Sequence, residues 1–422
     1  LVTGVQTCAL PISYFERSFL FMTEREITAT LQRLIKDYEP DIIAWRRHLH
    51  RHPELSFEEV ETTKYIASQL EEMGIPYEIN TEKNTGLIGW IDGGRPGKTV
   101  ALRADIDALP VTEKTGFDFA SENVGKMHAC GHDAHMSILL GAAKMLMAVK
   151  DQLPGRVYLV FQPSEETGEG GEYMKRFGTW YQEIDSIFGG HIWIDLPAGK
   201  ISIEPGERMA AAIEFGVDVI GKQGHGAQPH LTVDATVVAS AIVMNYQTIV
   251  SRGISPLDSV VVTVGKFMSG DRYNVISGKA RLEGTVRYFK NDIGDWVKAK
   301  LQSIAEDTAK AYGAEAKVTI RQMVLPLINE PKSAALGAES VKKLLGEDHL
   351  ATMTKTMAGE DFSSYLTDKP GAFGFFGIAN PELGAIYSHH SDNFTIDESA
   401  LAQGAGVYAQ YAVDFLTQNE NK

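Results

Sequence analysis

Along the chain, short continuous apolar runs alternate with segments in which apolar residues recur every three or four positions. Short apolar runs at residues 99–108 and 156–161 have the length and composition of buried strands. Apolar residues three or four positions apart predict helices between and after such runs, for example over residues 136–147 and 398–417. Alternating strands and helices are typical of an α/β domain, whose crevice lies at the carboxyl ends of the strands. The pattern therefore predicts an α/β fold with its functional residues at those ends.

The first helical segments come before this alternation. Residues 27–35 and 42–49 predict two separate helices, because Pro40 lies between them and cannot donate a backbone hydrogen bond. Thr23 and Glu26 have the spacing of a capping box, so we expect the first helix to begin directly after Thr23.

The pattern changes between residues 207 and 324. Strands and helices are expected there in the order βαββαβ, with helices over residues 233–250 and 296–312. This order predicts a small ferredoxin-like domain inserted into the larger domain. Residues 22–206 and 325–422 would then form the catalytic domain. The inserted domain would serve as a lid and as a dimerisation surface, since its outer strands offer an unpaired edge.

The first 21 residues are interpreted separately. Residues 2–12 resemble the in-frame translation of a sequencing-adapter oligonucleotide, and residues 13–21 lack a convincing signal-peptide pattern. We therefore expect residues 1–21 to be a non-native leader and Met22 to be the natural start. Cys130 would then be the only natural cysteine.

Composition narrows the classes of function. The 422 residues carry a net charge of −15, which argues against nucleic acids and anionic membranes as partners. No apolar run approaches the roughly 20 residues that cross a bilayer. With only 2 cysteines the sequence suits a reducing cytoplasm, and Cys130 remains available for chemistry. We therefore expect a cytoplasmic protein that does not associate with membranes.

Residues 127–135, with the sequence MHACGHDAH, gather a thiol, three imidazoles and a carboxylate just before a predicted helix. The helix N-terminus is expected to lower the pKa of the Cys130 thiol and to favour the thiolate, which binds metal together with His132. This segment alone leaves two alternatives open. One is a structural cysteine with hydrogen-bonded histidines, and the other is a cysteine nucleophile with a distant histidine base.

Further candidate ligands follow other predicted strands. Asp105 and Asp107 end one strand and point the same way, and such carboxylates often accept the second N–H of metal-bound histidines. Glu165 and Glu166 follow another strand, where one could bind metal while the other handles a proton. His191 follows two glycines at the end of an apolar run. Each of these residues is also compatible with a solvated strand end.

Together, these donors exceed what a mononuclear catalytic zinc site needs. The surplus predicts two divalent metal ions, which can activate water and polarise a carbonyl. Cys130 is the candidate bridging ligand, because one thiolate sulfur can bind two cations. The remaining candidate ligands are His132, Glu166, His191 and His390. Thiolate and imidazole favour zinc, cobalt or nickel over magnesium or calcium, and manganese is a fourth candidate.

The chain resembles the M20 metallopeptidases. Within them it is similar to the amidohydrolase subfamily of hippurate hydrolases, indole-acetyl-amino-acid hydrolases and N-acetyl-amino-acid deacetylases. The resemblance extends from Thr23 to the end of the chain, and its blocks occur in the family's order. They are residues 46–59, 105–110 (DIDALP), 127–135, 162–168 (QPSEETG), 190–191, 224–226 (GHG), 359–362 (GEDF) and 390–391.

The resemblance implies a role for each matching residue. The implied metal ligands are Cys130, His132, Glu166, His191 and His390. Glu165 would be the general base, and Asp107 would contact the ligands without binding metal itself. His225, Asn274 and Arg287 would face the substrate from the inserted domain. His225 is suited to stabilise the oxyanion, and the guanidinium fork of Arg287 is suited to bind the substrate's α-carboxylate.

The expected activity is metal-dependent hydrolysis of the amide bond of N-acyl amino acids, with an acetyl, benzoyl or aryl-acetyl group, to a carboxylic acid and a free amino acid. The partners would be a small-molecule substrate and further copies of the chain, in a homodimer or homotetramer assembled through the inserted domain. Two alternatives remain open. A di-metal exopeptidase acting on dipeptides would require a free substrate amine, and a catalytically silent metal-binding protein would have no use for an uncoordinated Glu165.

Overall fold

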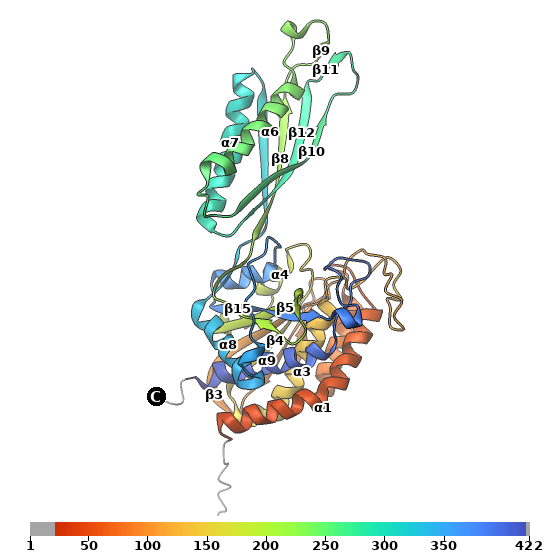
Figure 1. Cartoon of the computed structure of the whole chain (residues 1–422), viewed down its shortest axis with the longest axis vertical. Coiled ribbons are helices and arrows are strands. Elements are labelled where there is room, and N and C mark those ends of the chain that lie inside the picture. The colour runs from red at the N-terminus through yellow and green to blue at the C-terminus, as the bar shows by residue number, and fades with distance from the viewer. Residues whose placement is uncertain (1–21, 419–422) are drawn as a thin grey trace, which may run out of the picture.

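In the computed structural model, residues 22–418 form two bodies stacked along the long axis of the molecule (Figure 1). The larger body holds the beginning and the end of the described chain, and the smaller body is formed by a segment from the middle of the sequence. The expected non-native leader, residues 1–21, lies outside the described residues.

The larger body is built on a mixed sheet. Its strands are β1 (Tyr77–Ile79), β2 (Leu87–Asp92), β3 (Arg95–Asp105), β4 (Pro154–Gln162), β5 (Ser186–Pro197), β6 (Ile201–Ser202) and β15 (Gly371–Ala379). They lie in the order β1-β2-β4-β3-β5-β15-β6. The four central strands β4, β3, β5 and β15 run parallel, whereas β1, β2 and β6 pair antiparallel to their neighbours. The expected mixed α/β fold is therefore confirmed.

Helices cover both faces of this sheet. They are α1 (Glu24–Arg51), α2 (Val60–Glu72), α3 (His132–Val149), α4 (Gly170–Lys175), α5 (Trp180–Glu183), α8 (Pro331–Leu345) and α9 (Ser399–Thr417). Short 3-10 helices cover Lys150–Gln152, Pro229–Leu231, Glu347–His349, Asp361–Thr367 and Pro381–Leu383. Of the described residues, none belongs to a helix that is both long and apolar enough to cross a membrane.

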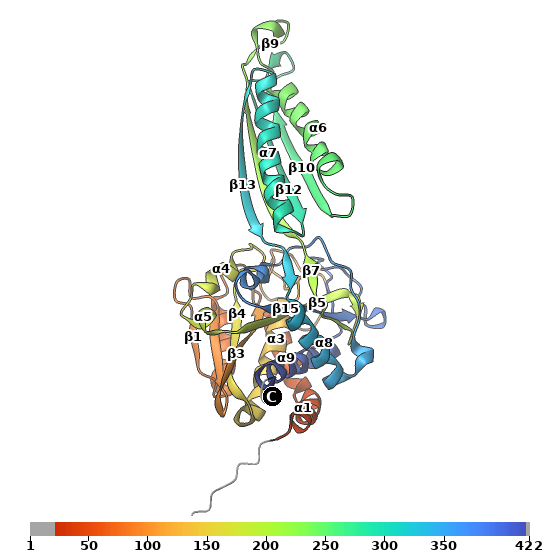
Figure 2. The ribbon, with the colours of Figure 1, turned by 90° about the vertical axis from the view of Figure 1, so that its left-hand side faces the viewer.

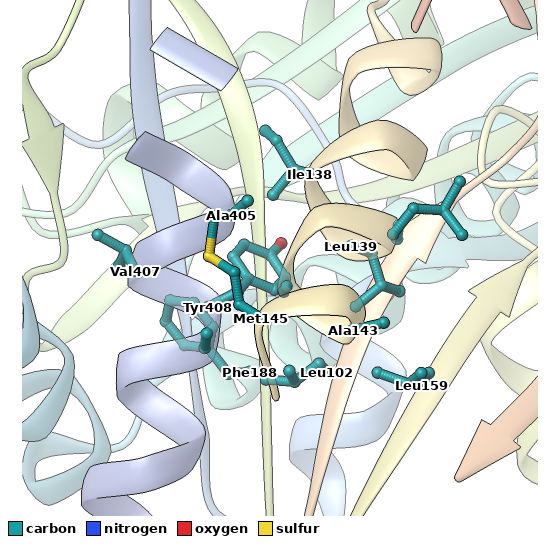
Figure 3. Packing of buried hydrophobic residues seen from close by; sticks show 14 of the residues in the cluster. Leu102, Ile138, Leu139, Ala143, Met145, Leu159, Phe188, Ala405, Val407 and Tyr408 are labelled. Atoms are coloured by element: carbon teal, nitrogen blue, oxygen red, sulfur yellow. The ribbon is translucent and has the colours of Figure 1, made fainter. Parts of the chain in front are cut away.

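Alternate residues of the strands pack into two different hydrophobic cores. Val157, Leu159 and Phe161 of β4 face one core, while Tyr158 and Val160 face the other, because successive strand side chains point to opposite faces. The first core holds α3 and α9 against the sheet. Figure 3 shows residues from both helices packed against strand residues such as Leu102, Leu159 and Phe188.

Helix α1 corrects one prediction. It is one continuous helix with Pro40 inside it, not two helices separated by Pro40. Leu31 before the proline and Trp45 after it both pack into the same core, where α1 lies against α3 and α9. This shared burial offsets the loss of the hydrogen bond that proline removes, which costs about 3 kcal/mol. The predicted capping box of Thr23 and Glu26 is confirmed.

Strand β5 corrects a second prediction. The sequence placed His191 at a strand end released by Gly189 and Gly190, yet β5 continues through all three residues to Pro197. The glycines serve close packing. A Cβ at Gly189 would lie 2.7 Å from a Phe362 ring atom, and a Cβ at Gly190 would lie 2.3 Å from a Phe376 ring atom.

The smaller body is a four-stranded antiparallel sheet in the described part of the chain, with strand order β10-β12-β8-β13. The strands are β8 (Ala211–Ile220), β10 (Val260–Ser269), β12 (Lys279–Tyr288) and β13 (Glu315–Val324). Helices α6 (Ala235–Gly253) and α7 (Asn291–Ala311) cover one face of this sheet (Figure 2) and enclose a separate core. The elements follow the predicted order, β8-α6-β10-β12-α7-β13.

Two chain segments connect the bodies. Strands β7 (Gly206–Met209) and β14 (Leu327–Asn329) pair with each other and lead into β8 and out of β13. At the opposite end of the smaller body, β9 (Gly224–His225) pairs with β11 (Val275–Ile276). These two short strands form the tip that lies farthest from the larger body (Figure 1).

Candidate metal centre

Five donor side chains converge where the central strands of the larger sheet end. One group consists of Cys130, His132 and His191, and a second consists of Cys130, Glu166 and His390. Within each group the ligand atoms all lie within 4.8 Å of one another. Cys130 belongs to both groups, which is the arrangement that a bridging thiolate requires. The structure thus brings together all five predicted ligands.

The turn before α3 positions two of these ligands. Gly131 caps α3 with a φ of 96°, a left-handed conformation that glycine adopts without strain. A Cβ at this position would lie 2.3 Å from Cδ1 of Ile192. Only glycine therefore fits between Cys130 and His132, and the sulfur of Cys130 comes to lie 3.3 Å from Nε2 of His191.

Hydrogen bonds orient the two buried histidines. Nδ1 of His132 lies 3.2 Å from Oδ1 of Asp107, and Nδ1 of His191 lies 2.6 Å from the carbonyl oxygen of Ile192. Each contact uses the Nδ1 proton and leaves Nε2 as the available ligand atom. Among residues 22–418, Nε2 of His132 has no hydrogen-bond partner, although it is buried. Such orphaned atoms are rare, so the donors fit a bound cation.

His389 and His390 are separated by their surroundings. Nδ1 of His389 lies 3.2 Å from the carbonyl oxygen of Cys130, and its Nε2 accepts a bond from the amide of Ile194 at 3.4 Å. Both ring nitrogens are therefore engaged with backbone. His390 has a φ of 67°, which non-glycine residues rarely adopt, and its Nε2 lies 3.4 Å from Oε1 of Glu166. His390, and not His389, is thus the histidine of this pair that lies beside the other donors.

Asp107 is saturated by hydrogen bonds. Its carboxylate accepts the backbone amides of Glu165 and Glu166 at 3.0 and 3.1 Å and the hydroxyl of Ser56 at 2.7 Å, in addition to its contact with His132. Burial opposes ionisation, but these hydrogen bonds outweigh it and hold the pKa of Asp107 below its usual value. Asp107 is therefore an anionic group that contacts His132 and holds the backbone of Glu165 and Glu166.

Glu165 is adjacent to Glu166 but faces different groups. Its Oε1 accepts the backbone amide of Asp361 at 3.3 Å. Burial raises the pKa of Glu165 well above its usual value, and the carboxyl groups of Glu360, Asp361 and Glu166 add to the rise. The ionised form of such a carboxyl group is a stronger base than an exposed glutamate, and bound cations would favour that ionised form.

Cys130 corrects the prediction about its acidity. The helix N-terminus was expected to lower its pKa, but burial raises the pKa of the thiol well above its usual value, and Glu166 and Glu165 raise it further. A helix dipole contributes only about 0.3–1 kcal/mol at most sites, which is less than burial beside carboxylates. A thiolate at this position would therefore depend on positive charge from bound cations.

A buried arginine behind the ligands was not anticipated. Arg103 of β3 contacts Asp105 and Asp361 at 2.8 Å each and Glu360 at 3.1 Å. Asp105 in turn lies 2.5 Å from Nδ1 of His135. An arginine inside the apolar run of residues 99–108 was the one signal of this network, because a charge in a buried strand requires partners.

A cavity of about 460 Å³ opens beside the donors, between the two bodies. Glu165 and Cys130 line it from the larger body, and Arg287 of β12 lines it from the smaller body. Arg287 is half-buried and donates to the hydroxyl of Thr285 at 2.5 Å. It also donates to the carbonyl oxygen of Val286, and among residues 22–418 no carboxylate is one of its hydrogen-bond partners. The apolar lining comprises Trp193, Met209, Ala212, Ile213, Met323, Val324 and Ala358.

His225 and Asn274 lie far from this cavity in the same chain. Both are exposed at the tip formed by β9 and β11 (Figure 1). The cavity touches the first residues of β8, whereas the tip follows its last residue. At about 3.3 Å per residue, the length of β8 separates them by roughly 30 Å. The structure therefore does not bring these two predicted residues to the other donors within one chain.

Comparison with known proteins relates most of the chain to one family. A family model described as Peptidase family M20/M25/M40 matches residues 101–414. The N-acetyl-L-cysteine deacetylase of Bacillus subtilis is 39% identical over 382 residues, which cover 90% of each chain. The N-acyl-L-amino acid amidohydrolase of Geobacillus stearothermophilus is 39% identical over 327 residues, which cover 76% of this chain and 87% of the relative.

A solved structure shares the fold over nearly its whole length. It is the crystal structure of the YXEP protein of Bacillus subtilis, described as a dinuclear metal-binding peptidase from the M20 family. The two chains are 34% identical with a TM-score of 0.80, and the likeness covers 90% of this chain and 99% of the other.

Proposed function

Because the chain belongs to peptidase family M20/M25/M40, we propose that it is a metal-dependent amidohydrolase that cleaves N-acyl amino acids into a carboxylic acid and a free amino acid. The observation that carries this proposal is the pair of donor groups sharing Cys130, with Glu165 beside them in the same cavity. The names of two relatives, a deacetylase and an amidohydrolase, support the same substrate class.

The proposed cofactor is a pair of divalent cations, with zinc, cobalt, nickel and manganese as candidates. Cys130, His132 and His191 would hold one ion, and Cys130, Glu166 and His390 would hold the other. When bound, such ions activate water and polarise the amide carbonyl. The carboxylates around the donors supply compensating negative charge. Burial by itself would lower the pKa of His132, but these carboxylates outweigh burial and raise it to about 10.

The chain's own groups divide the remaining work. Glu165 takes a proton from the attacking water and returns one to the departing amine. The amide of Asp361 holds Oε1 of Glu165, which keeps the carboxylate aimed into the cavity. Asp107 fixes the backbone of both glutamates, so that Glu166 can serve as a ligand while its neighbour remains a base.

Arg287 is the proposed recognition group for the substrate's α-carboxylate. Burial lowers the pKa of Arg287, as expected for a cation without a paired anion. A bound carboxylate would supply this anion and accept two parallel hydrogen bonds from the guanidinium. The apolar lining of the cavity suits an acyl group such as acetyl, benzoyl or an aryl-acetyl group.

We also propose that residues 207–324 are an inserted ferredoxin-like lid and dimerisation domain. If the smaller body rotated as a rigid unit about its two connections, its tip would stay roughly 30 Å from those connections. The cavity lies beside the connections, so the tip would not reach it. His225 and Asn274 would therefore act in the site of a partner subunit. Exposed apolar residues on α6 and β10 support such an assembly. They are Val237, Met244, Val250, Val261, Phe267 and Met268.

The test is a substrate and metal screen. The protein is assayed with N-acetyl-, N-benzoyl- and indole-acetyl-amino acids, each in the presence of zinc, cobalt, nickel or manganese. Release of free amino acid from at least one blocked substrate, abolished by a chelator and restored by metal, is expected. Metal binding without turnover of any substrate would instead indicate a catalytically silent protein.

A di-metal exopeptidase remains the second candidate, because the matched family and the YXEP protein are both described as peptidases. The same screen separates the two functions when unblocked dipeptides are included. An amidohydrolase requires a blocked substrate amine, whereas an exopeptidase would hydrolyse the unblocked dipeptides faster than the blocked substrates.

A further inference from the structure

The turn that carries Glu165 and Glu166 has an unusual backbone. Ser164 is fully buried and has a φ of 59°, in the left-handed region that non-glycine residues rarely adopt. The amides of Ser164, Glu165 and Glu166 are consecutive, and each donates to a carboxyl group. Asp107 accepts the last two, whereas Glu59 accepts the amide of Ser164 at 2.8 Å.

Glu59 reaches this turn from a distant part of the sequence. It is the residue before α2, a position from which Ser, Thr, Asp or Asn side chains usually cap a helix, and Glu59 makes no capping hydrogen bond. Glu54 supplies the cap instead, through bonds to the amides of Thr62 at 2.7 Å and Glu61 at 3.3 Å. The carboxyl group of Glu59 is therefore directed to the turn and not to its own helix.

We propose that Glu59 is a positioning residue for the amide hydrolysis. Its carboxyl group accepts the amide of Ser164 and thereby fixes the left-handed turn. This turn directs the side chain of Glu165 to the amide of Asp361 and that of Glu166 to His390. The inference rests on the proposed function, because it assigns Glu59 an effect on catalysis through Glu165. Without this hold, Ser164 would relax toward an ordinary backbone conformation and carry both glutamates with it.

The state of the carboxyl group agrees with this role. Burial raises the pKa of Glu59 to about 8, and the nearby Asp107 carboxylate adds to the rise. Glu59 is thus protonated at neutral pH. Oε2, which has no hydrogen-bond partner in the described part of the chain, can carry the proton while Oε1 accepts from Ser164. Glutamine has nearly the same shape as this neutral acid and retains the accepting oxygen.

The experiment compares Glu59→Ala, Glu59→Gln and Glu54→Ala in the metal-loaded enzyme. Glu59→Ala should lower kcat by at least about tenfold with little change in KM, since small misplacements of catalytic groups cost up to about a hundredfold. Glu59→Gln should retain most of the wild-type kcat. Glu54→Ala is the matched control, because it weakens the same helix without touching the turn.

Amide hydrogen exchange supplies a readout that does not depend on activity. The amides of residues 164–166 should exchange faster in Glu59→Ala than in wild type, and should be unchanged in Glu54→Ala. If the wild type cleaves none of the blocked substrates, the proposed function fails, yet this comparison still tests the hold of Glu59 on the turn. Unchanged exchange in Glu59→Ala would overturn the inference.

A second substitution tests the mechanism directly. Glycine adopts a positive φ without strain, so Ser164→Gly in the Glu59→Ala background should recover part of the lost kcat. The proposal is overturned if Glu59→Ala keeps the wild-type kcat, or if Glu59→Gln loses as much as Glu59→Ala. An equal loss of kcat in Glu54→Ala would also overturn it, since a general loosening of α2 would then explain the effect.

Discussion

At the scale of single residues, adjacent side chains in this protein have different surroundings and hence different chemistry. Glu165 and Glu166 leave the backbone at consecutive positions, but the first faces the amide of Asp361 and the second faces His390. The same separation distinguishes His389, whose nitrogens are bonded to backbone, from His390. Single substitutions can therefore separate the roles of neighbouring residues.

Glu165→Gln should abolish turnover and leave the metal content near that of wild type. The amide cannot accept a proton from water, and general base catalysis contributes about a hundredfold to ten-thousandfold in rate. Metal content is measured by elemental analysis after gel filtration, alongside kcat. Glu166→Gln is the paired variant and should lose metal. A Glu165→Gln protein that loses metal but regains rate with added metal would show that the two roles are exchanged.

Cys130→Ser should weaken the binding of both ions. A serine hydroxyl is far less acidic than a thiol, so it bridges two cations poorly, and Cys130 is the donor common to both groups. Competition with a chelator measures the affinity, and activity at saturating metal measures the residual function. Retention of both ions with wild-type affinity would rule out the bridging thiolate.

Glu59 should make the protein less stable as the pH rises. Its pKa is about 8 in the folded chain and 4.5 as a free side chain. Between these values the folded state holds a proton that the unfolded state has lost. The contribution of Glu59 to the free energy of unfolding is therefore complete below about pH 4.5 and falls as the pH rises to 8, by about 1.4 kcal/mol per pH unit.

Glu59→Gln cannot ionise and should lack this dependence. Its free energy of unfolding relative to wild type should increase between about pH 5 and about pH 9, as measured by denaturant unfolding at each pH. Other titrating groups are common to both proteins and cancel in the difference. Parallel pH profiles for the two proteins would show that Glu59 is ionised in the folded state at neutral pH.

At the scale of elements, packing overrides local signals at several points. Helix α1 continues through Pro40 because both halves bury side chains in one core. Strand β5 continues through Gly189 and Gly190 because both pair with β15, and two phenylalanine rings occupy the space that side chains would fill. The start of α3 depends on the same kind of fit, at Gly131, and permits a direct test.

Gly131→Ala should destabilise the protein and disturb the metal centre. The new methyl group combines the strain of a positive φ, about 1–3 kcal/mol, with a contact of 2.3 Å to Ile192. Gly125→Ala is the control, because Gly125 also has a positive φ, 84°, but its Cβ would meet nothing within 4 Å. Unfolding free energies and metal content are compared. Equal losses in both variants would mean that the packing against Ile192 is unimportant.

At the scale of the whole molecule, the tip of the smaller body is separated from the cavity of its own chain. Arg287 lies at one end of the four-stranded sheet, beside the cavity, whereas His225 lies in β9, beyond the opposite end of that sheet. A site that contains both residues therefore requires a second copy of the chain. The exposed apolar residues of α6 and β10 offer a surface through which two copies could associate.

Mixing two inactive variants tests this assembly. Glu165→Gln lacks the base and His225→Ala lacks the tip histidine, but a mixed dimer contains one site with both groups intact. If subunits exchange freely, activity should recover to roughly a quarter of wild type on statistical grounds. Exchange is followed independently with differently tagged chains. Demonstrated exchange without recovered activity would show that His225 does not act in trans.

Much of the fold and of the candidate site could be predicted from the sequence, because the relevant signals are local. Apolar periodicity over a few residues indicated the strands and helices on both sides of the inserted segment. The spacing of Cys130 and His132 placed two donors on one turn, Glu166, His191 and His390 followed as further candidates, and the family resemblance implied the same five ligands. These five donors do come together in the structure.

Only the tertiary structure decided how the site's groups are held and charged. The amide of Ser164 meets Glu59 across 105 positions of sequence, and no local pattern records such a contact. The raised pKa of Cys130 and the burial of Arg103 depend on side chains that converge from several strands. Desolvation and long-range electrostatics depend on every group packed nearby, whereas periodicity and capping depend on neighbours along the chain. The sequence by itself therefore determined the elements and the donors, and packing determined their protonation, orientation and reach.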